Sequence, residues 1–241
     1  MLIAVFDFET TGLDRLQDRV LEVGALLYST GHKRVLMAED FLIDNEVPIP
    51  AEATEVNHIK KGMTDKFGLV PNDGLLRLQN YFDQADTIAG KNIIDFDIPF
   101  YENWCLREGE EVIKKPTIDI ETDLPGTKSK HLGYMAADDG FLNPFPHAAL
   151  PDAWTTLRLI ESKIEKLGKD GLELIMQRAA SPRVTIKAHV SFDDNYKAKK
   201  RGYAWNSDRK VWFKNIKLMD LELEGKEAPF DISQIEPIPT H

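Results

Sequence analysis

Residues 2–13 carry the sequence LIAVFDFETTGL, in which an apolar run is followed by acidic residues and a polar turn. The run predicts a buried strand that ends in a turn. Asp7 and Glu9 stand two residues apart near the strand end, so both carboxylates point to one side. Phe6 and Phe8 point to the other side. An acidic pair taken alone most simply indicates a solvated strand end, and a cation site requires further acids elsewhere in the chain.

Two more apolar runs, residues 20–28 and 35–43, follow across short turn-like connections and predict an antiparallel start to a sheet. Beyond them, short strands alternate with segments whose apolar residues recur at helical spacing. The predicted strands lie at 87–90 and 115–120, and the predicted helices at 51–56, 72–85, 97–108, 151–167 and 172–179. This alternation predicts a mixed α/β layer fold.

The charge is distributed unevenly along the 241 residues. Between Arg183 and Lys217 there are ten Lys or Arg residues and three acids, a balance of +7. The net charge of the whole chain is −10, so the remainder carries −17. Ser181-Pro182 is the natural boundary between the two parts. We therefore expect a domain over residues 1–180, a small basic α+β domain over 183–226, and a loosely held tail over 227–241.

Composition indicates the class and compartment of the protein. A hydrophobic content of 42% supports a substantial core. The single cysteine, Cys105, excludes an internal disulfide and suits a reducing cytoplasm. The start of the chain lacks the features of a secretory signal, and no apolar run is long enough to cross a membrane. We expect a soluble cytoplasmic protein without a membrane partner.

Three segments of this sequence resemble the motifs of one enzyme family. DFETTGL at 7–13 resembles the first motif of the DEDD exonucleases, which belong to the DnaQ-like (proofreading exonuclease) superfamily. GKNIIDFDIPF at 90–100 resembles the second motif. HAALPDA at 147–153 resembles the third motif in its histidine-bearing form, DEDDh. The motifs occur in the family's order, and the resemblance covers about residues 1–167.

The resemblance implies a ribonuclease H-like fold, in which helices flank a mixed five-stranded sheet. It also implies two divalent cations, Mg²⁺ or alternatively Mn²⁺, held by Asp7, Glu9, Asp97 and Asp152. His147 is implied as the base that accepts a proton from the attacking water, although a histidine taken alone is more often an ordinary one. The implied contacts with the terminal nucleotide are Thr10, Thr11, Leu13 and Asn92. Lys91 departs from the family's usual histidine and places a cation near phosphate.

The implied activity is 3′→5′ exonuclease hydrolysis of DNA, with single-stranded 3′ ends as the first substrate and a role such as DNA repair. An exoribonuclease remains an alternative, because the same acids serve both sugars and no residue is identified as a reader of the 2′-hydroxyl. A non-catalytic nucleic-acid-binding protein on the same fold is a further alternative. A homodimer is also left open.

The basic segment interleaves cations with aromatic residues at 197–205 and 210–214. Cations neutralise phosphates and flat rings stack on bases, so this mixture suits single-stranded nucleic acid. The segment is similar to a small C-terminal domain of some exonucleases of the exodeoxyribonuclease X type. Alternatively, its aromatic residues form the core of a small domain. These residues are Tyr203, Trp205, Trp212 and Phe213.

Overall fold

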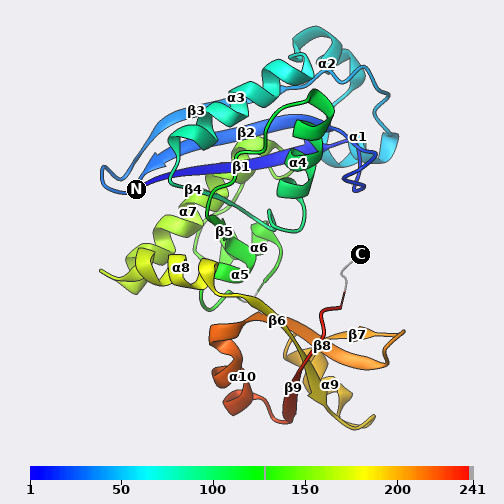
Figure 1. The fold of residues 1–241 in the computed structure, drawn as a ribbon, viewed down its shortest axis with the longest axis vertical. Helices are drawn as coiled ribbons and strands as arrows, with labels where there is room; N and C mark the ends of the chain where they lie inside the picture. Colours follow the sequence, from blue (N-terminus) through cyan, green and yellow to red (C-terminus); the bar gives the residue numbers. More distant parts are fainter. Residues whose placement is uncertain (128, 239–241) are drawn as a thin grey trace. The chain divides into compact units, whose positions relative to one another are not determined.

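The structure is a computed structural model that describes residues 1–127 and 129–238 (Figure 1). The chain folds into two compact units, one spanning Met1–Ala179 and the other beginning at Ala180. Among the described residues, no helix has both the length and the apolar character that a membrane span needs.

Within the described part of the first unit, five strands form one mixed sheet in the order β3-β2-β1-β4-β5. Strand β1 pairs antiparallel with β2 and parallel with β4, so the strand that bears Asp7 and Glu9 lies at the centre. Strand β3 is antiparallel to β2, and β5 is parallel to β4. The predicted ribonuclease H-like sheet is confirmed. Its strands are β1 (Leu2–Thr10), β2 (Val20–Ser29), β3 (Arg34–Leu42), β4 (Thr87–Gly90) and β5 (Thr117–Asp119).

Helices flank this sheet (Figure 1). Five were predicted within a few residues, namely α1 (Ala51–Asn57), α3 (Pro71–Gln84), α4 (Asp97–Glu108), α7 (Ala149–Leu167) and α8 (Gly171–Ala180). The short helices α2 (Lys61–Phe67), α5 (Ile120–Asp123) and α6 (Leu132–Asp138) were not predicted.

Strand β1 is buried on both faces, which explains its nearly continuous apolar sequence. Phe6 and Phe8 pack in a core with residues of α3 and α4, including Phe82 and Trp104. On the opposite face, Val5 and Ile3 belong to a second core with residues of α7 and α8, namely Ala153, Leu157, Leu159, Ile160 and Ile175. The alternation of side chains therefore directs Asp7 and Glu9 to the α7 side of the sheet.

A close approach of backbone to backbone determines where α7 begins. A Cβ at Gly24 of strand β2 would lie 2.2 Å from the carbonyl carbon of Ala149 and from the nitrogen of Leu150. Only glycine leaves room for the first turn of α7 against this strand. Gly24 pairs with Asp7 in the sheet, so the approach occurs beside the acidic pair.

In the second unit, the described residues form a four-stranded antiparallel sheet in the order β7-β8-β6-β9. The expectation of a loose tail is wrong for residues 231–235, which form β9 and pair with β6. The prolines at 229 and 237 were the reason for expecting a loose tail, but they flank the strand and do not interrupt it. The elements are β6 (Arg183–His189), α9 (Asn195–Lys200), β7 (Ala204–Asn206), β8 (Val211–Lys217), a 3₁₀ turn (Leu218–Asp220), α10 (Leu221–Glu227) and β9 (Asp231–Ile235).

The substitution Gly24→Ala tests the close approach. Because the obstructing atoms are backbone, we expect a loss of about 1–3 kcal/mol of stability, measured by calorimetric unfolding of the full chain. Gly31→Ala is the matched control, since nothing lies within 4 Å of its added Cβ. Equal unfolding temperatures for the two variants would contradict the assigned role of Gly24.

Candidate active site

Strand β1 supplies two acids to the candidate site. Asp7 lies opposite Gly24 in the β1–β2 ladder, and Glu9 lies opposite Glu22. Glu9 is only 9% exposed, although a glutamate side chain in water is charged at neutral pH and is normally solvated. The ladder shifts register between Glu9 and Thr10, so the strand becomes irregular directly after the acidic pair. Irregularities of this kind are common next to active sites, where they redirect side chains.

Helix α4 brings a third acid to the same place. Asp97 is the first residue of α4, and its carboxylate oxygen Oδ1 accepts a hydrogen bond of 3.0 Å from the backbone N–H of Phe8. Phe8 lies between Asp7 and Glu9 in the strand. Asp97 is only 2% exposed, so this bond fixes a buried carboxylate beside the pair. Asp95, which stands two residues earlier, lies before the helix.

The fourth acid and the histidine come from the start of α7. Asp152 accepts a hydrogen bond of 3.2 Å from the backbone N–H of His147 and another from the side-chain amide of Asn143. His147 has a φ of 61°, a left-handed conformation that is uncommon outside glycine. This turn places the imidazole next to the helix that carries Asp152. His147 is itself exposed, so its ring is accessible to solvent.

The five side chains converge on one place. One ligand atom each from Glu9, His147 and Asp152 can be chosen so that all lie within 4.8 Å of one another. Burial raises the pKa of Asp7 well above its usual value, and the charges of Asp97, Asp152 and Glu9 raise it further. The structure thus brings together all the residues that the motifs placed in the catalytic set.

Burial and mutual repulsion act on the other acids in the same direction. Loss of solvation, followed by repulsion from Asp152, raises the pKa of Glu9 to about 8. Burial raises the pKa of Asp97 to about 7, against the opposing effect of the hydrogen bond from Phe8. The pKa of Asp152 is also raised by burial. Burial is the largest cause of each shift, and repulsion between the acids adds to it for Asp7 and Glu9.

The loop after β1 presents two apolar side chains, Leu13 and Leu16, to solvent. Thr10 and Thr11 are 8% and 5% exposed, and their hydroxyls bond within the loop, to the Gly12 carbonyl and to Asp18 respectively. The backbone N–H of Thr11 is likewise bonded, to the carbonyl of residue 19. Leu13, by contrast, is 84% exposed. Of these three predicted nucleotide contacts, Leu13 has the side chain that is free to pack on a ligand.

The segment after β4 lies next to the acids. Asn92 has a φ of 57°, and its backbone N–H donates 2.9 Å to the buried carboxylate of Asp119, which thereby holds the turn. Asp119 also accepts from the backbone N–H of Ile94, so it is a structural acid. Burial raises the pKa values of Asp7, Asp97 and Asp152, and the positive charge of Lys91 acts in the opposite direction on all three. The ammonium of Lys91 therefore lies near the site. Its Nζ also lies 3.8 Å from Oε2 of residue 121.

Sequence reasoning missed Glu22 and Asn143. Glu22 accepts a hydrogen bond of 2.8 Å from the backbone N–H of Ala149, at the start of α7, and burial raises its pKa to about 7. Its pairing opposite Glu9 was the available signal, but it requires the register of the β1–β2 hairpin. Asn143 bonds the Asp152 carboxylate from a loop with no local pattern, so no signal in the sequence marks it.

Comparison with known families identifies the first unit. The model of the RNase T family, described as exonuclease, matches residues 4–196. The chain belongs to this exonuclease family. The predicted DnaQ-like membership, with its ribonuclease H-like fold, is therefore confirmed.

Curated relatives of this exonuclease are much longer proteins. The chain is 30% identical over 156 residues to the PolC-type DNA polymerase III of Pediococcus pentosaceus, covering 63% of the chain and 10% of the polymerase. It is also 30% identical over 205 residues to the PolC-type DNA polymerase III of Lacticaseibacillus paracasei, covering 83% of the chain and 13% of the polymerase. The chain thus spans about a tenth of the length of these relatives.

Solved structures share the fold at lower identity. Escherichia coli exonuclease I in complex with a dT13 oligonucleotide superposes with a TM-score of 0.65 at 13% identity, over 97% of this chain and 65% of that chain. Exonuclease I from Methylocaldum szegediense gives a TM-score of 0.63 at 19% identity, over 81% of this chain and 49% of that chain.

The raised pKa values predict an unusual dependence of stability on pH in EDTA. The folded state holds a proton on Glu9 up to about pH 8, whereas the unfolded chain releases it near 4.5. Protonation therefore stabilises the fold, and this contribution is lost as pH rises through the folded value. We expect Glu9→Gln to raise the melting temperature at about pH 9 more than at about pH 5. The exposed Glu55→Gln is the control, and parallel profiles for all three proteins would contradict the prediction.

Proposed function

We propose that this exonuclease hydrolyses phosphodiester bonds from the 3′ ends of DNA, acting first on single strands. The observation that carries the proposal is the convergence of four acids and one histidine from three separate segments. The DEDDh order of the motifs implies the 3′→5′ direction. Relatives named as DNA polymerases and the fold shared with exonuclease I bound to oligonucleotides support DNA as the substrate.

The donor set fits divalent cations. Asp7, Glu9, Asp97 and Asp152 offer oxygen atoms only, which suit Mg²⁺ or Mn²⁺ better than softer metals. Their pKa values are raised first by burial and then by repulsion among the acids, and bound cations would offset that repulsion. The ammonium of Lys91 offsets part of the negative charge of these acids, but it also forms an ion pair with Glu121. We therefore assign two divalent ions to these four residues.

Two ions held there would supply positive charge that stabilises the attacking and leaving oxygens of the displacement at phosphorus. The imidazole of His147 accepts the proton of the attacking water, a role suited to this side chain near neutral pH. The backbone bond from His147 to Asp152 holds the turn on which the imidazole is carried. Asn143 and Glu22 are positioning residues, because they bond Asp152 and the start of α7 rather than the reacting atoms.

Two predicted residues next to the acids complete the substrate site. Leu13 packs against the terminal base, since an exposed leucine beside the metal pair offers an apolar surface to a flat ring. Lys91 neutralises a phosphate oxygen of the strand as it enters. Asn92 fixes the turn that carries Lys91 through its backbone bond to Asp119.

An oligodeoxynucleotide labelled at its 5′ end tests the substrate and the direction together. With Mg²⁺ we expect a ladder of labelled products that shorten one nucleotide at a time, and with EDTA no cleavage. Removal from the 5′ end would instead release a labelled mononucleotide at once and overturn the proposed direction. A labelled RNA of the same sequence tests the exoribonuclease alternative.

Asp7→Asn should reduce cleavage to background, whereas Asp138→Asn, at an exposed acid outside the site, should not.

His147→Gln tests the proposed base. A positioned general base typically contributes about 10²- to 10⁴-fold to the rate, so we expect kcat to fall by that factor with little change in KM. The acidic limb of the pH–rate profile should flatten, because the group that must lose a proton is absent. His131→Gln is the control, since this exposed histidine lies outside the site. An unchanged pH–rate profile in His147→Gln would remove His147 from the mechanism.

A further inference from the structure

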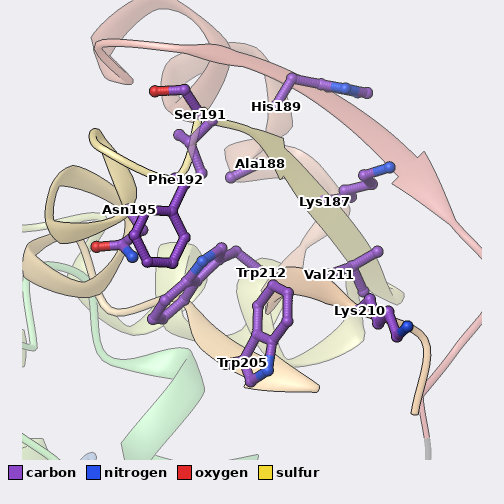
Figure 2. A pocket seen from close by; sticks show the side chains of 11 residues that line it. Lys187, Ala188, His189, Ser191, Phe192, Asn195, Trp205, Lys210, Val211 and Trp212 are labelled. Atoms are coloured by element: carbon purple, nitrogen blue, oxygen red, sulfur yellow. The ribbon is translucent and has the colours of Figure 1, made fainter. Parts of the chain in front are cut away.

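The second unit contains a pocket that the proposed hydrolysis does not use. Its volume is about 820 Å³, within the range of sites that bind small molecules or parts of larger ligands. Strands β6, β7 and β8 line it, together with the loop that follows β6 and the first residue of α9. Figure 2 shows three aromatic rings gathered in one part of this pocket and two lysines in another.

The aromatic rings of the pocket are more exposed than a structural role requires. Phe192 is 88% exposed and Trp205 is 50% exposed. Trp205 lies beside Trp212 with ring centroids 5.6 Å apart and planes tilted by 54°. Trp212 packs partly on the core of the unit, which consists of Ile186, Ala188, Ala198 and Tyr203. Phe192 and Trp205 therefore present apolar faces to solvent, and Trp205 rests on a ring that packs against the core.

The charged residues of the pocket are positive. Lys187 and Lys210 line it, and among its described lining residues there is no carboxylate. Neither lysine forms an ion pair within residues 1–127 and 129–238. Other cations of the basic segment are engaged internally. Arg201 and Lys214 bond Glu224, which also accepts from the hydroxyl of the buried Tyr203.

The combination of exposed flat rings and unpaired cations points to a polyanion whose bases are unpaired. A nucleobase presents a flat face that stacks on indole or phenyl rings, and this contact tolerates every base. The adjoining phosphate requires a cation, which Lys187 and Lys210 provide. A duplex meets these conditions poorly, because its bases are already stacked and paired. An apolar peptide would leave the two lysines without a counter-charge.

We propose that this pocket binds single-stranded nucleic acid, with bases stacked on Phe192 and on Trp205 and phosphates neutralised by Lys187 and Lys210. The proposal rests on the proposed function in one respect, because an exonuclease gains from a unit that retains the strand it shortens. Binding by the pocket needs neither the acids nor a metal ion. The two proposals can therefore succeed or fail separately.

Fluorescence anisotropy of a labelled oligothymidylate with the full chain in EDTA measures this binding. We expect Trp205→Ala and Phe192→Ala each to weaken Kd by about 5- to 150-fold, the range for loss of one stacked base. Trp205→Phe, which keeps a flat ring, should retain most of the affinity. Tyr196→Ala is the matched control, since Tyr196 is 58% exposed in the same unit but does not line the pocket.

The dependence of binding on salt tests the lysines. Lys187→Gln and Lys210→Gln should each lower the slope of log K against log salt by about 0.7, the value for one phosphate contact on a single strand. Lys199→Gln removes the same charge from an exposed position on α9 outside the pocket. It should leave the slope unchanged. An equal decrease in all three variants would show that diffuse charge attracts the strand and would overturn the pocket.

Competitors and a small substrate separate the remaining outcomes. Oligouridylate should compete about as well as oligothymidylate, because stacking does not depend on the sugar, whereas a blunt duplex should compete poorly. Full affinity in both Trp205→Ala and Phe192→Ala, or equal competition by duplex, would overturn the proposal. The p-nitrophenyl ester of thymidine 5′-phosphate contains a single nucleotide, so it reports hydrolysis without a strand for the pocket to retain. Its hydrolysis should be unchanged in the pocket variants and lost in Asp7→Asn.

Discussion

Repulsion between carboxylates held at the end of one central strand is the constraint on which the first unit depends. Neutral backbone donors, rather than cations, hold several of these acids in place. The N–H of Phe8 bonds Asp97 and that of His147 bonds Asp152. A neutral donor orients a carboxylate and leaves its net charge available. The site is therefore fixed in geometry while its negative charge is kept, which is the condition that the proposed two-ion hydrolysis requires.

Close packing of helix α7 on strand β2 brings the second half of the site to the first. Asp152 and His147 are far from Asp7 in sequence, and they reach it because the backbone of α7 passes directly over Gly24. Glu22, two residues before Gly24, bonds the first N–H of the helix. One short stretch of β2 thus provides both the space and the anchor for the second half of the site.

The second unit uses its charges differently. The carboxylate of Glu224 accepts hydrogen bonds from Arg201, Lys214 and the hydroxyl of Tyr203. Part of the basic segment therefore stabilises the unit itself. Lys187 and Lys210 lie outside this hydrogen-bond network and line the pocket together with the exposed aromatic rings. The structure places Tyr203 in the core of the unit, as one alternative expected, whereas Trp205 stays half-exposed.

The sequence by itself determined the order and type of most elements, because apolar periodicity and turn residues are local signals. Strand β4 and helix α4 begin and end where those signals place them. It also determined the candidate acids, through three motifs that need no knowledge of the fold.

Only the tertiary structure decided which neighbours complete the site. Glu22 is an ordinary strand residue until the hairpin register sets it opposite Glu9, and Asn143 contacts Asp152 from an irregular loop. Tyr203 and Trp205 stand two residues apart with similar character, yet one is buried and the other half-exposed. Register, burial and strand pairing join residues that are distant in the chain, so no local pattern specifies them.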